Sequence, residues 1–254
     1  MAEQHRASQK PPETGAFFLP ATPADRLIVA LDVSSVAEAQ RIVGAVGPSA
    51  ATFKVGKQLF VAEGPRAVRD LVASGRKVFL DLKFHDIPNT VAGAVKAAAE
   101  LGASMVTVHA SGGAKMLKAA AEAAATAPNP PLVLAVTVLT SMGQQDLEEV
   151  GVAGRPLDQV LRLASLARIA GCTGIVASPE EVGEIRRQLG KGLVIVTPGV
   201  RPEGTAKGDQ KRVATPAEAI HAGANYLVVG RPITKAPDIG KAAKAVLDEI
   251  AAAK

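Results

Sequence analysis

Four charged residues stand at and just after the ends of two predicted strands, and their types suit proton transfer in a pocket. Asp81 and Lys83 are two residues apart, so in a regular strand their side chains project from the same face. Asp86 follows in the turn to the next helix, and Lys54 lies near the end of the preceding strand. Buried together, such groups titrate as a coupled unit and can hold or deliver a proton. The alternative, salt bridges that merely close the end of a barrel, is an expensive use of four charges.

A second group of residues suits phosphate binding. In Gly230-Arg231 the glycine lets the backbone approach an anion, and the arginine offers a forked pair of donors. The long segment 198–214 holds four basic residues, among them Arg201, against two acidic ones, and its length predicts a lid. The alternative is a solvated loop followed by an arginine that starts a helix.

Other candidates are weaker. His85 and His109, with the nearby aspartates, have the ligand types of a metal site, but Lys54 and Lys83 would repel a divalent ion there. Cys172 is the single cysteine, which excludes an internal disulfide framework, and it is expected to be a small buried residue. Ser178 lacks the G-x-S-x-G context of a serine nucleophile. We therefore predict no metal.

The elements that must position these residues alternate regularly along the chain. Short β-branched runs, which predict strands, are followed by Ala-, Glu- and Lys-rich segments of helical period. The predicted strands are 27–32, 51–55, 77–82, 104–109, 132–138, 174–177, 193–197 and 225–229. The predicted helices are 35–46, 64–74, 90–101, 113–126, 156–170, 179–189, 215–222 and 238–252.

This alternation predicts an α/β fold, and eight units favour a single (β/α)8 TIM barrel over an open doubly wound sheet. The first strand–helix turn also lacks the G-x-G-x-x-G of dinucleotide-binding sheets. We predict that residues 25–254 form the catalytic barrel domain and that residues 1–24 form a short, disordered, flexible leader. The polar candidates lie at the carboxyl ends of predicted strands or in the loops after them, which is where barrel enzymes place their reactive groups.

Composition narrows the class of partner. The chain has 254 residues and a formal net charge of +5, with 48% apolar, 21% charged and only 3% aromatic residues. Without tryptophan or long basic blocks the chain does not resemble a nucleic-acid-binding protein. No apolar run is long enough for a membrane span, and the N-terminus lacks the apolar core of a secretory signal. We expect a cytoplasmic enzyme acting on a small phosphate-bearing molecule.

The segment 81–90, DLKFHDIPNT, resembles the signature of the orotidine 5′-phosphate decarboxylase family. Other segments agree with that family in order and spacing over about residues 27–235. They are ALD at Asp32, KVG at Lys54, VHASGG at His109, VTVLTSM at Thr140, VTPGVRP at Arg201, GDQKR at Gln210 and VVGRPIT at Arg231.

The resemblance implies a carbon–carbon lyase that converts orotidine 5′-phosphate to UMP, the last step of de novo UMP biosynthesis, without a metal or organic cofactor. It implies that Lys83 donates a proton to C6 of the pyrimidine after carbon dioxide leaves. Asp81 would lie beside the substrate carboxylate. Asp86 would complete the charged array from the partner subunit of a homodimer.

The remaining roles implied by the resemblance concern substrate binding. Asp32 and Lys54 would hold ribose hydroxyls, helped by Thr90 of the partner. Thr140, with Ser141, would meet the pyrimidine edge. The phosphate would be held by Arg201, Gln210, Gly230 and Arg231.

Three alternatives stay open. Related barrel enzymes acting on sugar phosphates, as decarboxylases or aldolases, share the D-x-K-x-x-D segment but use Mg²⁺, with an acidic residue where this chain has Lys54. A Schiff-base aldolase would use Lys83 as its nucleophile. A non-catalytic nucleotide-binding protein would bind UMP without turning over the orotate nucleotide.

Overall fold

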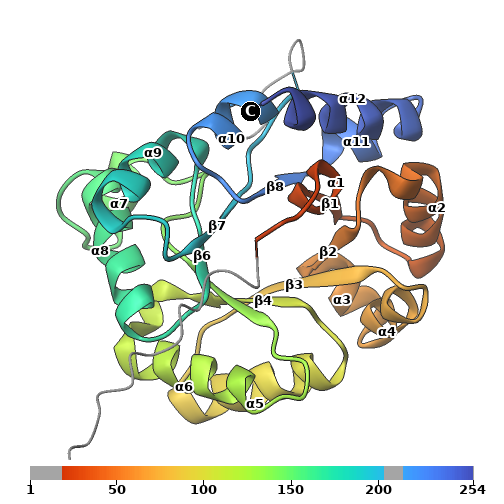
Figure 1. The fold of residues 1–254 in the computed structure, drawn as a ribbon. Coiled ribbons are helices and arrows are strands. Elements are labelled where there is room, and N and C mark those ends of the chain that lie inside the picture. The colour runs from red at the N-terminus through yellow and green to blue at the C-terminus, as the bar shows by residue number, and fades with distance from the viewer. Residues whose placement is uncertain (1–18, 203–213, 254) are drawn as a thin grey trace, which may run out of the picture.

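The computed structural model describes residues 19–202 and 214–253. Eight parallel strands close into a barrel in sequence order, and helices form a ring around it (Figure 1), as predicted. The strands are β1 Leu27–Leu31, β2 Thr52–Gly56, β3 Lys77–Phe84, β4 Met105–His109, β5 Leu132–Val136, β6 Gly174–Val176, β7 Val194–Thr197 and β8 Tyr226–Val229. All eight lie where the sequence predicts them, and no strand end differs by more than two residues.

Helices connect the strands. They are α1 Pro23–Arg26, α2 Val36–Val46, α3 Lys57–Glu63, α4 Arg66–Ala73, α5 Pro88–Glu100, α6 Gly113–Ala125, α7 Gln144–Glu149, α8 Pro156–Ile169, α9 Pro179–Leu189, α10 Pro216–His221, α11 Arg231–Thr234 and α12 Ile239–Ala252. The described ranges also contain the 3₁₀ helices Gly47–Ser49 and Ala110–Gly112. No helix in the described ranges has the length and apolarity that crossing a membrane requires.

The sequence analysis did not predict four short helices, α1, α3, α7 and α11. A helix of one or two turns presents too few residues for its period to show. The first of them begins at Pro23, inside the segment predicted as a leader, and Thr22 caps it by accepting a hydrogen bond from the amide of Asp25. Residues 1–18, which make up most of the predicted leader, lie outside the described part of the chain.

The apolar core has two layers, because each strand is buried on both faces. One layer fills the space between the barrel and its helices. The other fills the lower part of the barrel interior with side chains such as Phe79, Met105, Leu134 and Tyr226. In this interior, Gly174 of β6 leaves no room for a side chain, since a Cβ there would lie 2.3 Å from the Val194 carbonyl oxygen. This packed interior closes the barrel beneath the carboxyl ends of the strands, where the candidate cavity lies.

Candidate active site

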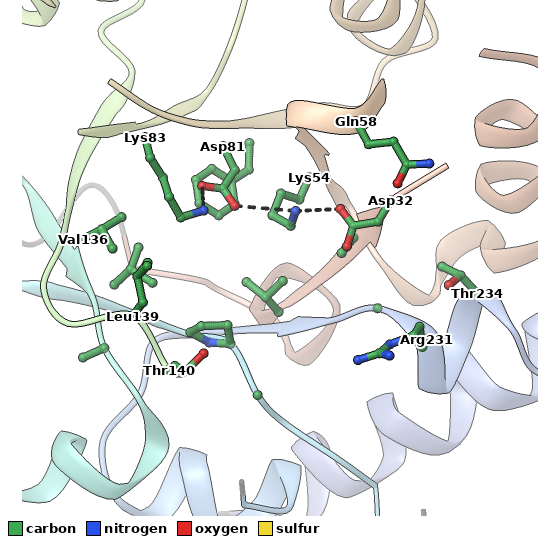
Figure 2. A pocket seen from close by; sticks show the side chains of 18 of the residues that line it. Asp32, Lys54, Gln58, Asp81, Lys83, Val136, Leu139, Thr140, Arg231 and Thr234 are labelled. Carbon is green, nitrogen blue, oxygen red and sulfur yellow. Dashed lines mark hydrogen bonds and ion pairs between the residues drawn. The ribbon is translucent and has the colours of Figure 1, made fainter. Parts of the chain in front are cut away.

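A continuous row of alternating charges lies at the carboxyl ends of β1, β2 and β3 (Figure 2). The ammonium group of Lys54 lies 3.0 Å from Asp32 Oδ1 and 3.5 Å from Asp81 Oδ2. The ammonium group of Lys83 lies 2.8 Å from the other oxygen of Asp81. Three of the four residues predicted to cluster, Lys54, Asp81 and Lys83, are therefore together, and Asp32 completes the row.

Strand register brings these residues to one side of the barrel wall. Ala30 pairs with Lys54, and Gly56 pairs with Asp81. Since alternate residues of a strand share a face, Asp32 follows Ala30 toward the interior. Lys54 is 9% exposed, so its charge is held almost wholly by its two aspartate partners.

The backbone of β3 is irregular where it carries the reactive residues. Lys83 has a φ of 55°, and it is the one non-glycine residue with positive φ in the described ranges. Pairing with β4 shifts between Leu80 and Phe84, which marks a bulge. The prediction that Asp81 and Lys83 share a pocket is confirmed, but a bulged strand, and not regular alternation, brings them together. Thr107 of β4, which sequence analysis did not single out, accepts a hydrogen bond from the Lys83 amide at 2.8 Å.

Electrostatics favour an ionised Asp81. Burial alone would raise the pKa of its carboxyl group, but Lys54, Lys83 and the Thr107 hydroxyl together lower that pKa below its ordinary value. The carboxylate is thus charged at neutral pH and fixes both ammonium groups. Two carboxylates and two ammonium groups leave the row with no net charge.

Asp86 and Thr90 do not join this row within one chain. Both side chains are exposed, at the turn after β3 and on the first turn of α5, and neither lines the pocket. The Asp86 carboxylate accepts a hydrogen bond from the adjacent Ile87 amide at 2.6 Å. Grouping Asp86 with Lys54, Asp81 and Lys83 by sequence proximity alone is therefore not supported within the single chain.

The row forms one wall of a cavity of about 500 Å³. The facing wall comes from β5, β6 and the segments after them, and it is largely apolar: Val136, Val138, Leu139, Val176 and Ala177. Thr140 lines the same side, as predicted, while Ser141 is exposed and does not line the cavity. A flat ring placed between the walls would meet charges along one edge and apolar side chains along the other.

The predicted phosphate site lies at the end of β7 and β8. Gly230, Arg231 and Arg201 all line the cavity, and Figure 2 shows Arg231 across it from Lys83. Burial, together with the nearby Arg231 charge, lowers the pKa of the Arg201 guanidinium, so the two cations share one region. The amide of Arg201 donates to the Ala214 carbonyl at 2.9 Å, which joins the two ends of the predicted lid. Residues 203–213, including Gln210, lie outside the described part of the chain.

The weaker candidates have other surroundings. The rings of His85 and His109 stack with centroids 5.3 Å apart, and His109 Nδ1 lies 2.9 Å from the Ser111 hydroxyl. Burial first, and then the neighbouring His85 and two lysines, lowers the pKa of His109. In the described residues, no three His, Cys, Asp or Glu side chains gather in a way that could hold a metal ion. Cys172 is buried, as predicted, and burial raises the pKa of its thiol to about 12.

Comparison with known proteins agrees with this geometry. A model of the orotidine 5′-phosphate decarboxylase / HUMPS family matches residues 25–246, which is nearly the whole barrel. The chain belongs to this family. The resemblance seen in the sequence motifs is thus confirmed over the full fold.

Members of the family are similar to the chain over almost their entire lengths. An orotidine 5′-phosphate decarboxylase of Halorhodospira halophila is 57% identical over 228 residues, covering 90% of this chain and 97% of the relative. One of Moorella thermoacetica is 54% identical over 232 residues, covering 89% and 92%. The crystal structure of the enzyme from Lactobacillus acidophilus superposes with a TM-score of 0.80 at 39% identity, covering 89% of this chain and 99% of that one.

Proposed function

We propose that this chain is a carboxy-lyase that decarboxylates orotidine 5′-phosphate to UMP, completing the synthesis of the pyrimidine nucleotide. The observation that carries the proposal is the Asp32–Lys54–Asp81–Lys83 row, which faces an apolar wall in a cavity that ends at Arg231. Family membership and the names of close relatives support the same activity.

The reaction explains why an ammonium group is needed. When the bond from C6 to the carboxylate breaks, carbon dioxide leaves and the electron pair stays on C6, in the plane of the ring, where no conjugation can spread it. Preorganised positive charge in a dry pocket is the strongest stabilisation available for such an anion. Lys83 Nζ supplies this charge and then gives a proton to C6, after which water restores the ammonium group.

Asp81 holds Lys83 in place for this step. Its Oδ1 lies 2.8 Å from Lys83 Nζ, so the ammonium group is oriented before substrate arrives. A fixed, charged carboxylate also repels the substrate carboxylate, and loss of carbon dioxide relieves that repulsion. We propose that Lys54 and Asp32, next in the row, hold the ribose hydroxyls.

The phosphate is proposed to bind at Gly230, Arg231 and Arg201, with Gln210 from the segment between them. Arg231 is the first residue of α11, and Gly230 directly before it allows the backbone to come close to an anion. Binding the phosphate at a distance from C6 lets the enzyme use that energy to close the site around the ring. We propose that Thr140, which lines the cavity, contacts the pyrimidine edge.

We further propose a homodimer in which Asp86 and Thr90 enter the pocket of the partner subunit. Support comes from their exposure within one chain and from Ile87 beside them, a large apolar side chain that is 66% exposed. Burying this isoleucine side chain against another surface would be favourable. Mixing inactive Lys83→Ala and Asp86→Asn proteins would restore about a quarter of wild-type activity, because half of randomly paired dimers are hybrids with one intact site. Proven subunit exchange without any recovery would contradict the shared site.

The activity is tested by adding protein, purified in the presence of a chelator, to orotidine 5′-phosphate and following the loss of orotidylate absorbance. We expect turnover that EDTA does not diminish, in a cytoplasmic enzyme that needs no metal or organic cofactor. Turnover that requires added Mg²⁺ would favour a sugar-phosphate type of mechanism, which Lys54 disfavours at its position on β2. Binding of UMP with no turnover would instead indicate a nucleotide-binding protein.

A further inference from the structure

Thr107 of β4 lies directly opposite the bulge of β3. Leu80 pairs with Val106 and Phe84 pairs with Val108, so three residues of β3, from Asp81 to Lys83, face the single residue Thr107 on β4. Both of the residues proposed to act directly at the scissile bond lie in that bulge. An ordinary strand would hold them with a backbone ladder, which the bulge interrupts.

The Thr107 hydroxyl replaces the missing ladder with two hydrogen bonds. It accepts from the Lys83 amide at 2.8 Å and donates to Asp81 Oδ1 at 3.0 Å. The same Asp81 oxygen accepts from Lys83 Nζ at 2.8 Å, which closes a ring through the side chains and the Lys83 backbone. Thr107 is 0% exposed, so water does not compete for these bonds.

Lys83 needs such a restraint because its backbone is strained. A residue with a Cβ seldom adopts a φ of 55°, and it stays there only where its surroundings hold it. A relaxed backbone would carry the ammonium group away from its position over the pocket.

We infer that Thr107 is a positioning residue for the reaction, and that its hydroxyl holds the Lys83 backbone and the Asp81 carboxylate in one fixed arrangement. The inference rests on the proposed function for its kinetic consequence, but not for its structural one. Thr107 does not line the pocket and is not expected to touch substrate.

The test compares Thr107→Val, which keeps the shape and removes the hydroxyl, with Thr107→Ser, which keeps the hydroxyl. Thr137→Val is the matched control, because Thr137 is also buried and its hydroxyl donates to the Val176 carbonyl, outside the charged row. For Thr107→Val we expect kcat for orotidine 5′-phosphate to fall about tenfold or more, since misplacement of a reactive group is costly even when small. KM should change less than twofold, as the phosphate site is intact, and Thr107→Ser should recover most of kcat.

The pH profile separates positioning from a general loss of stability. Without the Thr107 donor the Asp81 carboxylate is less stabilised, so the acidic limb of kcat in Thr107→Val should move to higher pH. The control Thr137→Val should lose stability without moving that limb.

A second readout needs no activity at all. Hydrogen exchange at the Lys83 amide should be at least about tenfold faster in Thr107→Val than in wild type, and unchanged in Thr137→Val, because the amide loses its acceptor. A wild-type protein that fails to decarboxylate would overturn the proposed function, while this exchange result would still decide the role of Thr107. Unchanged kcat together with unchanged exchange would overturn the inference. If Thr107→Val does not fold, Thr107→Ala carries the same comparison, and failure of both to fold would overturn the inference in favour of a purely structural role.

Discussion

A lysine–aspartate pair lies at each end of strand β3, and in the first pair the aspartate comes from α1. At its start, Lys77 Nζ lies 3.4 Å from Asp25 Oδ1, and the two side chains are 59% and 22% exposed. Near its end, Lys83 Nζ lies 2.8 Å from Asp81 Oδ1, and the side chains are 27% and 13% exposed. The same two residue types are thus paired in two different environments.

The difference between the pairs lies in their neighbours. The first pair lies at the rim of the barrel bottom, where solvent screens it and it contributes between about 0 and 1 kcal/mol. The second continues through Lys54 to Asp32, and it stands over a packed apolar interior. Taking several charges out of water is expensive, and apolar residues of similar size often stabilise a fold as well or better. We therefore propose that the row at the carboxyl end of β3 serves the reaction, whereas the pair at its start is ordinary surface structure.

The largest expected effect comes from exchanging these two lysines for alanine in turn. Lys83→Ala should reduce kcat by about 10⁴-fold or more, since both electrostatic stabilisation and proton delivery are lost. Lys77→Ala, the matched control on the same strand, should leave kcat within about twofold. Steady-state kinetics on folded protein of both variants would measure the contrast. Comparable losses in the two variants would show that the ends of β3 do not differ as proposed.

A substitution in the apolar barrel interior beneath the row should have a large effect on stability and little effect on kcat. Leu134 is 0% exposed in the barrel interior, so Leu134→Ala should lower the free energy of unfolding by roughly 2–5 kcal/mol. The kcat of the protein that remains folded should be close to that of wild type. Urea denaturation paired with kinetics at low temperature would check both statements. A Leu134→Ala variant that kept its stability but lost kcat would contradict the proposal that this interior layer serves stability and the charged row serves the reaction.

Arg231 tests whether the upper end has a phosphate site distinct from the row. Removing a charge-assisted hydrogen-bonding group is worth roughly 1.5–3 kcal/mol, so Arg231→Ala should lower kcat/KM for orotidine 5′-phosphate about 10- to 150-fold. Its effect on orotidine, which lacks the phosphate, should be small. The ratio of the loss with orotidine 5′-phosphate to the loss with orotidine measures how much of the contribution of Arg231 to kcat/KM depends on the phosphate group. Equal losses for both compounds would mean that Arg231 acts, like the row, on the part of the substrate that both compounds share.

Sequence reasoning predicted the barrel well because parallel strands buried on both faces appear as uninterrupted apolar runs. It also placed Lys54, Asp81 and Lys83 together, since strand ends meet at one edge. It missed the bulge that produces their geometry, because a local shift of register leaves no periodic signal. Thr107 was not predicted for a related reason. Threonine is common in strands, and the proposed role of Thr107 depends on the bulge of β3 that lies opposite it. Sequence reasoning also grouped Asp86 with the row from its position in the sequence, whereas the Asp86 side chain is exposed and does not line the cavity.

The smallest expected effect is a pH-dependent one at the lower end of β3. A hydrogen bond from Thr22 first, and then the Lys77 charge, lowers the pKa of Asp25 below its ordinary value of 3.8. A carboxyl group whose pKa is lower in the folded chain stabilises the fold above its unfolded pKa, and this contribution disappears as the pH falls through the folded pKa. Asp25→Asn should therefore lower the free energy of unfolding by no more than about 1 kcal/mol near neutral pH. The two stability curves should converge below the folded pKa, in a series of denaturation experiments from pH 7 to strongly acidic solution.

Activity near neutral pH should be unaffected, because the charge removed lies at the other end of the barrel from the row. A large loss of kcat in Asp25→Asn would mean that the two ends are coupled through β3, and the contrast between its two pairs would then have to be abandoned.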